Sequence, residues 1–299
     1  MRINELEIKD FKVFYGSCLI DLHTAGQNLL VYGEIGTGKS SLALALKLFL
    51  EAGVKHHEFA HYKNVFVEDN SGYIKIKLGH NPYEWSSTAK PSDPIIIDAA
   101  KTKGFIDYKG LLETYFIQRE HDRVNIFDLL VTNILGNTIN DITQKAFLSD
   151  WQGILQKIPR RNYQSRVKVL ELSIADFNNG LRTKLSELKA KASDVLLRFG
   201  YDVELEFDYQ GISYNKSKKT IDGKEVILKV TYRSQELVKH HHFLNEARLS
   251  AIALSIHFAS LLLTPSSDLK VLILDDALIG LDMSNRLPPT YRCDIKREG

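Results

Sequence analysis

Alternating apolar and polar positions predict several short strands in the first third of the chain. Residues 2–8 (RINELEI) and 73–78 (YIKIKL) follow a period of two, and residues 18–22 form another short apolar-rich run. Proline and serine are frequent in residues 81–94, which favours a loop. We therefore expect two strands at the N-terminus, a third at 73–78, and a loop after it.

Apolar residues spaced by three and four predict helices in the middle of the chain. Residues 125–135 place their apolar side chains on one helical face, and 141–198 are mainly helical in pattern with a break near Pro159. The longer stretch is too short for the sustained heptads of a long coiled-coil arm. Residues 203–209 and 225–232 alternate again, so a compact helical insert followed by an antiparallel β-segment is expected.

Residues 28–50 carry the most informative motif. The apolar run 29–32 predicts a buried strand, GEIGTGKS follows it, and an apolar helical pattern comes next. This is a complete G-x-x-x-x-G-K-S phosphate loop in its required context. Its glycines let backbone N–H groups surround phosphate oxygens, its lysine supplies a charge, and its serine offers a hydroxyl to Mg²⁺. The expected nucleotide-binding residues are Gly33, Glu34, Ile35, Gly36, Thr37, Gly38, Lys39, Ser40 and Ser41.

Residues 269–276 (LKVLILDD) predict the second half of the same site. Four successive apolar residues suit a central parallel strand that is buried on both faces, and ligands bind at the C-terminal ends of such strands. We expect a pair of buried acids there. Asp275 would hold Mg²⁺ with Ser40, and Asp276 would polarise the attacking water. The sequence thus predicts a P-loop nucleoside triphosphatase of the α/β class.

The spacing between the two halves excludes two classes of P-loop protein. More than two hundred residues separate Lys39 from Asp275, which does not fit small kinases or GTPases. A GTPase would also need an Asn-Lys-x-Asp guanine reader, and the closest text, 215–218 (NKSK), lacks the acid.

Two further stretches flank the acidic strand. Asn245 is a good N-cap, and the apolar positions after it repeat at helical spacing, so a helix begins there with its positive end exposed. Residues 280–282 (GLD) follow the strand.

This ordered set of motifs resembles the ABC-type ATPase heads of the structural-maintenance-of-chromosomes (SMC) and RecF group. It is especially similar to the RecF-like "AAA family" ATPases of bacterial defence and DNA-processing systems. The resemblance rests on the IKDFKVF strand, the phosphate loop, Gln118 as the Q-loop glutamine, LNEARLSAIAL in place of the signature motif, LILDD, and GLD as the D-loop.

The resemblance implies a mixed central sheet, Mg²⁺-dependent ATP hydrolysis, and a homodimer that sandwiches two ATP molecules. Lys39, Gln118 and Asp276 would be catalytic, and Ser40, Asp275 and Gln118 would hold the metal. Nucleotide contacts in addition to the phosphate loop are implied for Asn245, Arg248 and Asp282. The expected organisation is an N-terminal ATPase lobe at 1–137, a helical insert at 138–200, a C-terminal ATPase lobe at 201–285 and a disordered tail at 286–299.

Three departures from the family pattern qualify these expectations. Glu246 and Ala247 stand where the family has two glycines, so a negative charge is added next to the expected phosphate. Asp276 replaces the usual glutamate and is one methylene shorter. The strand with a switch histidine that should follow is missing, which predicts a truncated or frame-shifted product.

Composition leaves the partner open. Lys plus Arg number 39 against 37 for Asp plus Glu, so no global positive field argues for nucleic acid, although a local patch is compatible with this balance. Two distant cysteines, Cys18 and Cys293, fit free thiols in the cytoplasm, and no signal or membrane-spanning pattern is present. Two functions remain: an ATPase in a nucleic-acid-processing or anti-phage complex, with DNA or RNA as candidate ligands, or an ATP-gated scaffold for a separate effector or nuclease.

Overall fold

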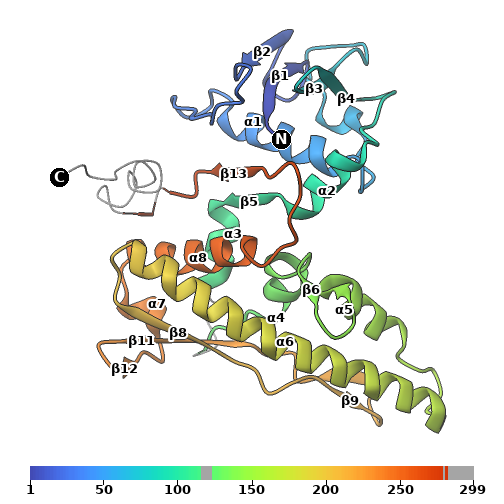
Figure 1. Cartoon of the computed structure of the whole chain (residues 1–299), viewed down its shortest axis with the longest axis vertical. Coiled ribbons are helices and arrows are strands. Elements are labelled where there is room, and N and C mark those ends of the chain that lie inside the picture. Colours follow the sequence, from blue (N-terminus) through green and yellow to red (C-terminus); the bar gives the residue numbers. More distant parts are fainter. Residues whose placement is uncertain (116–122, 279, 282–299) are drawn as a thin grey trace. The chain divides into compact units, whose positions relative to one another are not determined.

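The computed structural model describes residues 1–115, 123–278 and 280–281, and these form two compact units (Figure 1). Unit 1 combines Met1–Ile106 with Ser266–Asp276, and unit 2 combines Asp107–Pro265 with the chain from Ala277 onward. The fold is mixed α/β, as expected. The lobe boundaries inferred at residues 137, 200 and 285 stay predictions.

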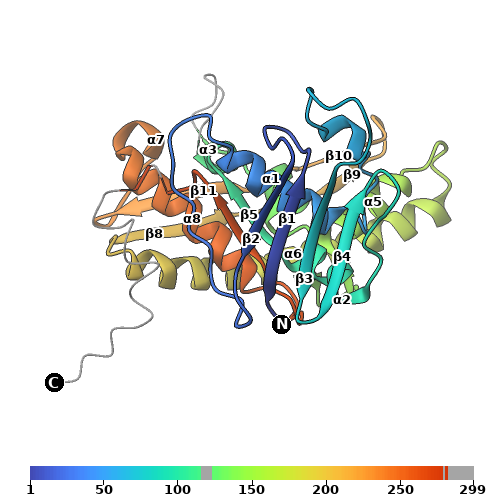
Figure 2. The same ribbon diagram turned by 90° about the horizontal axis from the view of Figure 1, so that it is seen from above.

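The main sheet of unit 1 has four antiparallel strands in the order β2-β1-β3-β4, and these lie side by side in Figure 2. Their bounds are β1 Ile3–Lys9, β2 Ser17–Asp21, β3 Tyr73–Leu78 and β4 Asn81–Ser86. Burial alternates along β1 and β3, and Ile8 lies opposite Ile74 in the register. The strands predicted from the period-two patterns are thereby confirmed.

The loop predicted at 81–94 is wrong in its first part, because 81–86 form β4. Pro82 is accommodated because β4 is the last strand of the sheet, so its backbone needs a partner on one side only. Trp85 from the same strand is fully buried.

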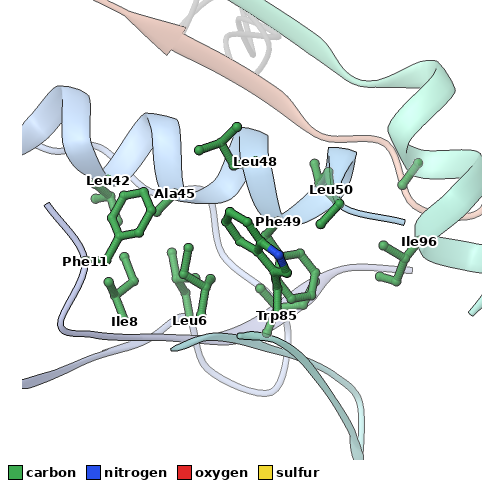
Figure 3. Close-up of a cluster of buried hydrophobic side chains, with 14 of the residues drawn as sticks. Leu6, Ile8, Phe11, Leu42, Ala45, Leu48, Phe49, Leu50, Trp85 and Ile96 are labelled. Carbon is green, nitrogen blue, oxygen red and sulfur yellow. The ribbon is translucent and has the colours of Figure 1, made fainter. Parts of the chain in front are cut away.

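Helix α1 (Lys39–Glu51) supplies much of the core of unit 1 (Figure 3). Leu42, Ala45, Leu48 and Phe49 are buried with residues of the sheet, as expected for an amphipathic helix after the phosphate loop. The 3₁₀ turn η1 (Phe59–Tyr62) and helix α2 (Pro94–Thr102) complete this core, because they add the buried side chains of Phe59 and Ile96.

The strand predicted before the phosphate loop is not formed. Residues 29–32 have no strand partner in the described part of the chain, and their side chains are exposed, Leu30 by 88% and Tyr32 by 98%. Strand β13 (Leu272–Asp275) pairs with β5 (Gly104–Asp107), but Leu272 and Leu274 are 50% and 37% exposed. The prediction of a strand buried on both faces is therefore wrong. An apolar run becomes a buried strand only where partner strands and covering helices exist, and the run itself does not supply them.

Unit 2 begins with short elements and continues with two helices. It contains α3 (Tyr108–Tyr115), α4 (Phe127–Leu129), the π-helical turn η2 (Leu130–Ile134), β6 (Ile139–Asn140), β7 (Lys145–Ala146), α5 (Phe147–Gln156) and α6 (Gln164–Arg198). The helices predicted in 125–135 and 141–198 are confirmed, including the break near Pro159. Aromatic rings join α5 to α6, with Phe147 and Trp151 both packed on Phe177.

The remaining elements of unit 2 are β8 (Val203–Asp208), β9 (Ser213–Asn215), β10 (Thr220–Asp222), β11 (Ile227–Tyr232), β12 (Gln235–Glu236), α7 (His240–Phe243) and α8 (Glu246–Leu261). The predicted antiparallel segment is β8 paired with β11, and β9 forms a hairpin with β10. Helix α8 is apolar on nearly all sides and is buried accordingly. No helix in the described part of the chain combines the length and apolar character that a membrane crossing requires.

A buried ion pair lies at the C-terminal end of α1. Glu51 is only 6% exposed, and its carboxylate lies 3.0 Å from Lys103 Nζ, with Lys55 at 3.3 Å and His57 at 3.2 Å. Burial acts to raise the pKa of Glu51, but the lysine charges, that of Lys103 first, outweigh it and hold the pKa below its ordinary value.

Glu51→Gln should therefore destabilise the protein by about 3–5 kcal/mol, because Lys103 would stay buried without a counter-charge. Asp98→Asn is the matched control, since it breaks the exposed pair with Lys101 and should cost below about 1 kcal/mol. Urea unfolding followed by circular dichroism measures both. Equal effects of the two changes would contradict the assignment of the buried pair.

Candidate functional site

The phosphate loop has backbone geometry that its glycines make accessible. Gly36 and Gly38 have φ values of 89° and 99°, in the left-handed region that other residues avoid. A Cβ atom on Gly38 would also come within 2.8 Å of Val13 Cγ2. Thr37 closes the turn by donating its backbone N–H and its hydroxyl to Glu34 O. The loop is thus a compact turn directly at the start of α1.

The N-terminus of α1 offers unpaired donors. Gly38 caps the helix without a side-chain hydrogen bond, and the first turn contains no acidic residue. The first backbone N–H groups of a helix have no partner within it and carry a partial positive charge, so this end attracts an anion.

The side chain of Lys39 folds back over the phosphate loop. Its Nζ donates to Gly33 O at 2.9 Å and to Glu34 O at 2.8 Å. A phosphate oxygen carries more negative charge than a peptide carbonyl and would compete for the same protons. The lysine is therefore already held at the loop that is expected to bind phosphate.

The structure brings together Ser40 and Asp275, which are 235 positions apart. Ser40 Oγ donates to Asp275 Oδ1 at 3.0 Å, which joins the first turn of α1 to the end of β13 within unit 1. Hydroxyl and carboxylate oxygens are ligands that suit Mg²⁺. No group of three or more His, Cys, Asp or Glu in the described residues could hold a metal ion, so such an ion would need ligands besides these side chains, for which phosphate and water are suited.

Asp276 differs from the expected buried acid. Asp275 is half-buried, whereas Asp276 is exposed and has a φ of 53°. The expectation of two buried carboxylates is wrong, because β13 ends at Asp275 and the left-handed backbone places the next side chain in solvent. Asp276 is accessible to a water molecule at the end of the strand.

The start of α8 lies in unit 2. Asn245 Oδ1 accepts the backbone N–H of Arg248 at 3.1 Å, which confirms the predicted N-cap. The Arg248 guanidinium lies 4.9 Å from the centre of the Tyr232 ring, and its Nη2 donates to the Tyr232 hydroxyl at 3.4 Å. Arg248 is thus held by an aromatic residue that the sequence did not single out.

The carboxylate of Glu246 is engaged within the same unit. The Tyr108 hydroxyl donates to Glu246 Oε1 at 3.3 Å. Desolvation raises the pKa of Tyr108 first, and the negative charge of Glu246 raises it further, so the tyrosine remains a donor. Sequence reasoning missed Tyr108 because no motif contains it.

Gly280 packs against α8. A Cβ atom at Gly280 would overlap Ser250 Oγ and would approach Glu246 Cγ at 3.6 Å. A side chain at position 280 would therefore require Ser250 to shift, because this first part of the GLD segment lies directly against the helix after Asn245.

Gln118, Asp282 and residues 286–299 lie outside the described residues. The roles assigned to Gln118 and Asp282, and the disordered tail, accordingly stay predictions. Asn245 and Arg248 belong to unit 2, whereas Lys39, Ser40 and Asp275 belong to unit 1.

Comparison with solved structures identifies the fold. The recombination mediator protein RecF bound to ATP aligns with a TM-score of 0.55 and 13% identity, covering 97% of this chain and 90% of RecF. The Smc head domain from Pyrococcus furiosus, with an extended coiled coil and bound to the C-terminal domain of ScpA, aligns with a TM-score of 0.50 and 10% identity, covering 95% and 84%. No family model and no curated protein matches the sequence. The chain has the fold of an ABC-type ATPase head like those of RecF and Smc.

Gly280→Ala should destabilise the protein by about 1–3 kcal/mol, because the methyl group overlaps Ser250 on a well-packed helix. Gly153→Ala in α5 is the matched control. Nothing lies within 4 Å of its added Cβ, so helix propensity should make it neutral or slightly stabilising. Thermal unfolding compares the two, and a Gly280 variant as stable as the Gly153 variant would contradict the close approach.

Proposed function

We propose that this chain, which has the ABC-type ATPase head fold, binds and hydrolyses ATP with Mg²⁺ and dimerises when ATP is bound. The observation that carries the proposal is the hydrogen bond between Ser40 and Asp275. It joins the last residue of a complete phosphate-loop motif to the acid at the end of β13, as a shared metal and phosphate site requires.

Each candidate site residue of unit 1 that the structure describes has a defined task in this proposal. Gly36, Gly38 and the N-terminus of α1 direct backbone N–H groups at the phosphates. Lys39 would exchange its two loop carbonyls for phosphate oxygens, and Ser40 and Asp275 would hold Mg²⁺. When bound, the metal ion neutralises charge that develops on the phosphate oxygens. Asp276 orients water and accepts its proton.

The start of α8 supplies the partner surface of the proposed homodimer. Asn245 and Arg248 would face the γ-phosphate held by the phosphate loop of the second copy, with Asp282 nearby, while Gln118 would contact the metal of its own copy. Two contacts support this role: Tyr232 holds Arg248, and Tyr108 engages Glu246. With its carboxylate directed to Tyr108, Glu246 is placed to accept a hydrogen bond instead of opposing phosphate.

The biological setting follows from the relatives by analogy. RecF is described as a recombination mediator, and the Smc head binds ScpA. By this analogy the chain would act in a nucleic-acid-processing complex with a separate protein as effector, and the sequence resemblance adds an anti-phage defence complex as the other setting.

A second candidate is an ATP-gated scaffold that dimerises but does not turn over. Asp276 favours this alternative, because it is shorter than glutamate and exposed at a left-handed position. Single-turnover hydrolysis with ATP-dependent dimerisation measured by light scattering separates the two. Dimerisation without product formation would establish the scaffold.

Lys39→Ala should weaken ATP binding by roughly 30-fold to 1000-fold, because it removes charge-assisted hydrogen bonds worth about 2–4 kcal/mol in total. Lys101→Ala removes an exposed lysine of unit 1 and should leave affinity unchanged. Isothermal titration calorimetry measures both variants. Wild-type affinity in the Lys39 variant would refute the nucleotide site.

Asp276→Asn should retain ATP binding and lower single-turnover hydrolysis by about 10²–10⁴-fold, because the amide cannot accept the proton of the attacking water. Asp268→Asn, an exposed aspartate of the same unit, is the control and should hydrolyse ATP at the wild-type rate. Undiminished hydrolysis in the Asp276 variant would show that another residue is the base.

A further inference from the structure

Two segments of unit 2 carry a concentrated positive charge. Residues 157–168 (KIPRRNYQSRVK) connect α5 to α6 and begin α6, and residues 214–219 (YNKSKK) form the β9–β10 turn. We call these two segments the basic tip. They contain eight cationic side chains and no carboxylate: Lys157, Arg160, Arg161, Arg166, Lys168, Lys216, Lys218 and Lys219.

Hydrogen bonds hold the two segments together. Asn162 Nδ2 donates to Lys216 O at 2.8 Å, and the Tyr214 hydroxyl donates to Asn162 Oδ1 at 2.7 Å. Lys219 Nζ donates to Arg160 O at 2.7 Å. Figure 1 shows β9 beside the N-terminal part of α6. The basic tip is therefore one surface made from two parts of the chain.

The eight charges are exposed and largely uncompensated. All eight residues are exposed, and Lys216 is the one among them that pairs with a carboxylate in the described part of the chain, Glu171 at 3.0 Å. Lys157 and Lys219 donate to neutral oxygens instead. Removing these eight from the 39 Lys and Arg leaves 31 against 37 Asp and Glu, a net charge of −6 for the rest of the chain. The near-neutral total conceals a strongly asymmetric distribution.

The local backbone adds to this positive potential. Helix α6 starts at Gln164 without a side-chain cap or an acidic residue in its first turn. Beside it lies an open hollow of about 620 Å³, lined by Lys157, Arg160, Ser165 and Arg166 among others. Like charges that lie this close together repel one another and lower the stability of the fold. We therefore expect the basic tip to bind an anionic partner.

We propose that the basic tip binds the phosphate backbone of a nucleic-acid duplex without reading its sequence. Within these two fully described segments the aromatic rings are those of Tyr163 and Tyr214. Tyr163 faces the Arg166 guanidinium at 5.9 Å, and Tyr214 is hydrogen-bonded to Asn162. Tyr163 is 54% exposed, but two separate rings among eight cations do not form the row of aromatic side chains on which successive unpaired bases stack, which favours a duplex over a single strand. This surface lies in unit 2 and does not depend on the nucleotide site.

The test is fluorescence anisotropy of the full chain with a labelled 30-base-pair DNA duplex, without nucleotide, across a series of salt concentrations. The double variant Arg161→Gln with Arg166→Gln should bind at least tenfold more weakly. The slope of log affinity against log salt should decrease by roughly 1 per cation removed. Lys145→Gln with Lys189→Gln changes the net charge equally at exposed positions outside the tip, and should stay within about twofold of wild type.

Two additions make the outcome decisive. Arg161→Lys with Arg166→Lys keeps the charge and should restore the wild-type slope, which distinguishes lost charge from lost folding. Equal losses in the tip and control variants, or an unchanged slope, would overturn the proposal. An RNA duplex of the same length identifies the source of the phosphates, since tip-dependent binding of either duplex supports the proposal. In a competition experiment, unlabelled polyglutamate is compared with an unlabelled duplex at equal charge concentration. Equal displacement of the labelled duplex by the two would overturn the proposal and would indicate an acidic protein as the partner.

Discussion

The hydrogen bond from Ser40 to Asp275 is the contact on which the proposed chemistry depends. It connects two residues 235 positions apart, and neither half of the site contains both oxygens. Its length is set by the position of α1 relative to the end of β13, within a unit that combines Met1–Ile106 with Ser266–Asp276. The buried face of α1 provides this position, because Leu42, Ala45, Leu48 and Phe49 fix the helix on the sheet. The core of unit 1 therefore acts directly on the geometry of the site.

Features governed by local rules could be predicted from the sequence. The alternation in β1 and β3 specified both the strands and their buried faces, since neighbouring side chains of a strand point to opposite sides. Asn245 predicted the start of α8 because its side chain needs only the backbone N–H three residues ahead. The phosphate loop could be located for the same reason, since its turn uses only its own residues.

Features that depend on distant partners could not be predicted. The run 29–32 has the composition of a buried strand, yet in the described residues nothing pairs with it, and its side chains are exposed. The contacts between Tyr108 and Glu246 and between Gly280 and Ser250 likewise join residues far apart in sequence. Composition also concealed the basic tip, because its eight cations are balanced by acids elsewhere along the chain. The hydrogen bond between Tyr214 and Asn162 joins the two basic segments into one patch, and composition carries no information about such a contact.

Asp276 lies at a point where the chain passes from unit 1 to unit 2. The chain passes from unit 1 to unit 2 after Ile106 and again after Asp276, and Asp276 is the residue that we expect to orient water. Its backbone is left-handed, a conformation that costs energy for a residue with a side chain and is retained only where the surroundings impose it. Four residues later, Gly280 packs against α8 so closely that an added Cβ would overlap Ser250 Oγ. Asp276 is the last residue of unit 1, and its left-handed backbone sets the direction in which the exposed carboxylate leaves the end of β13.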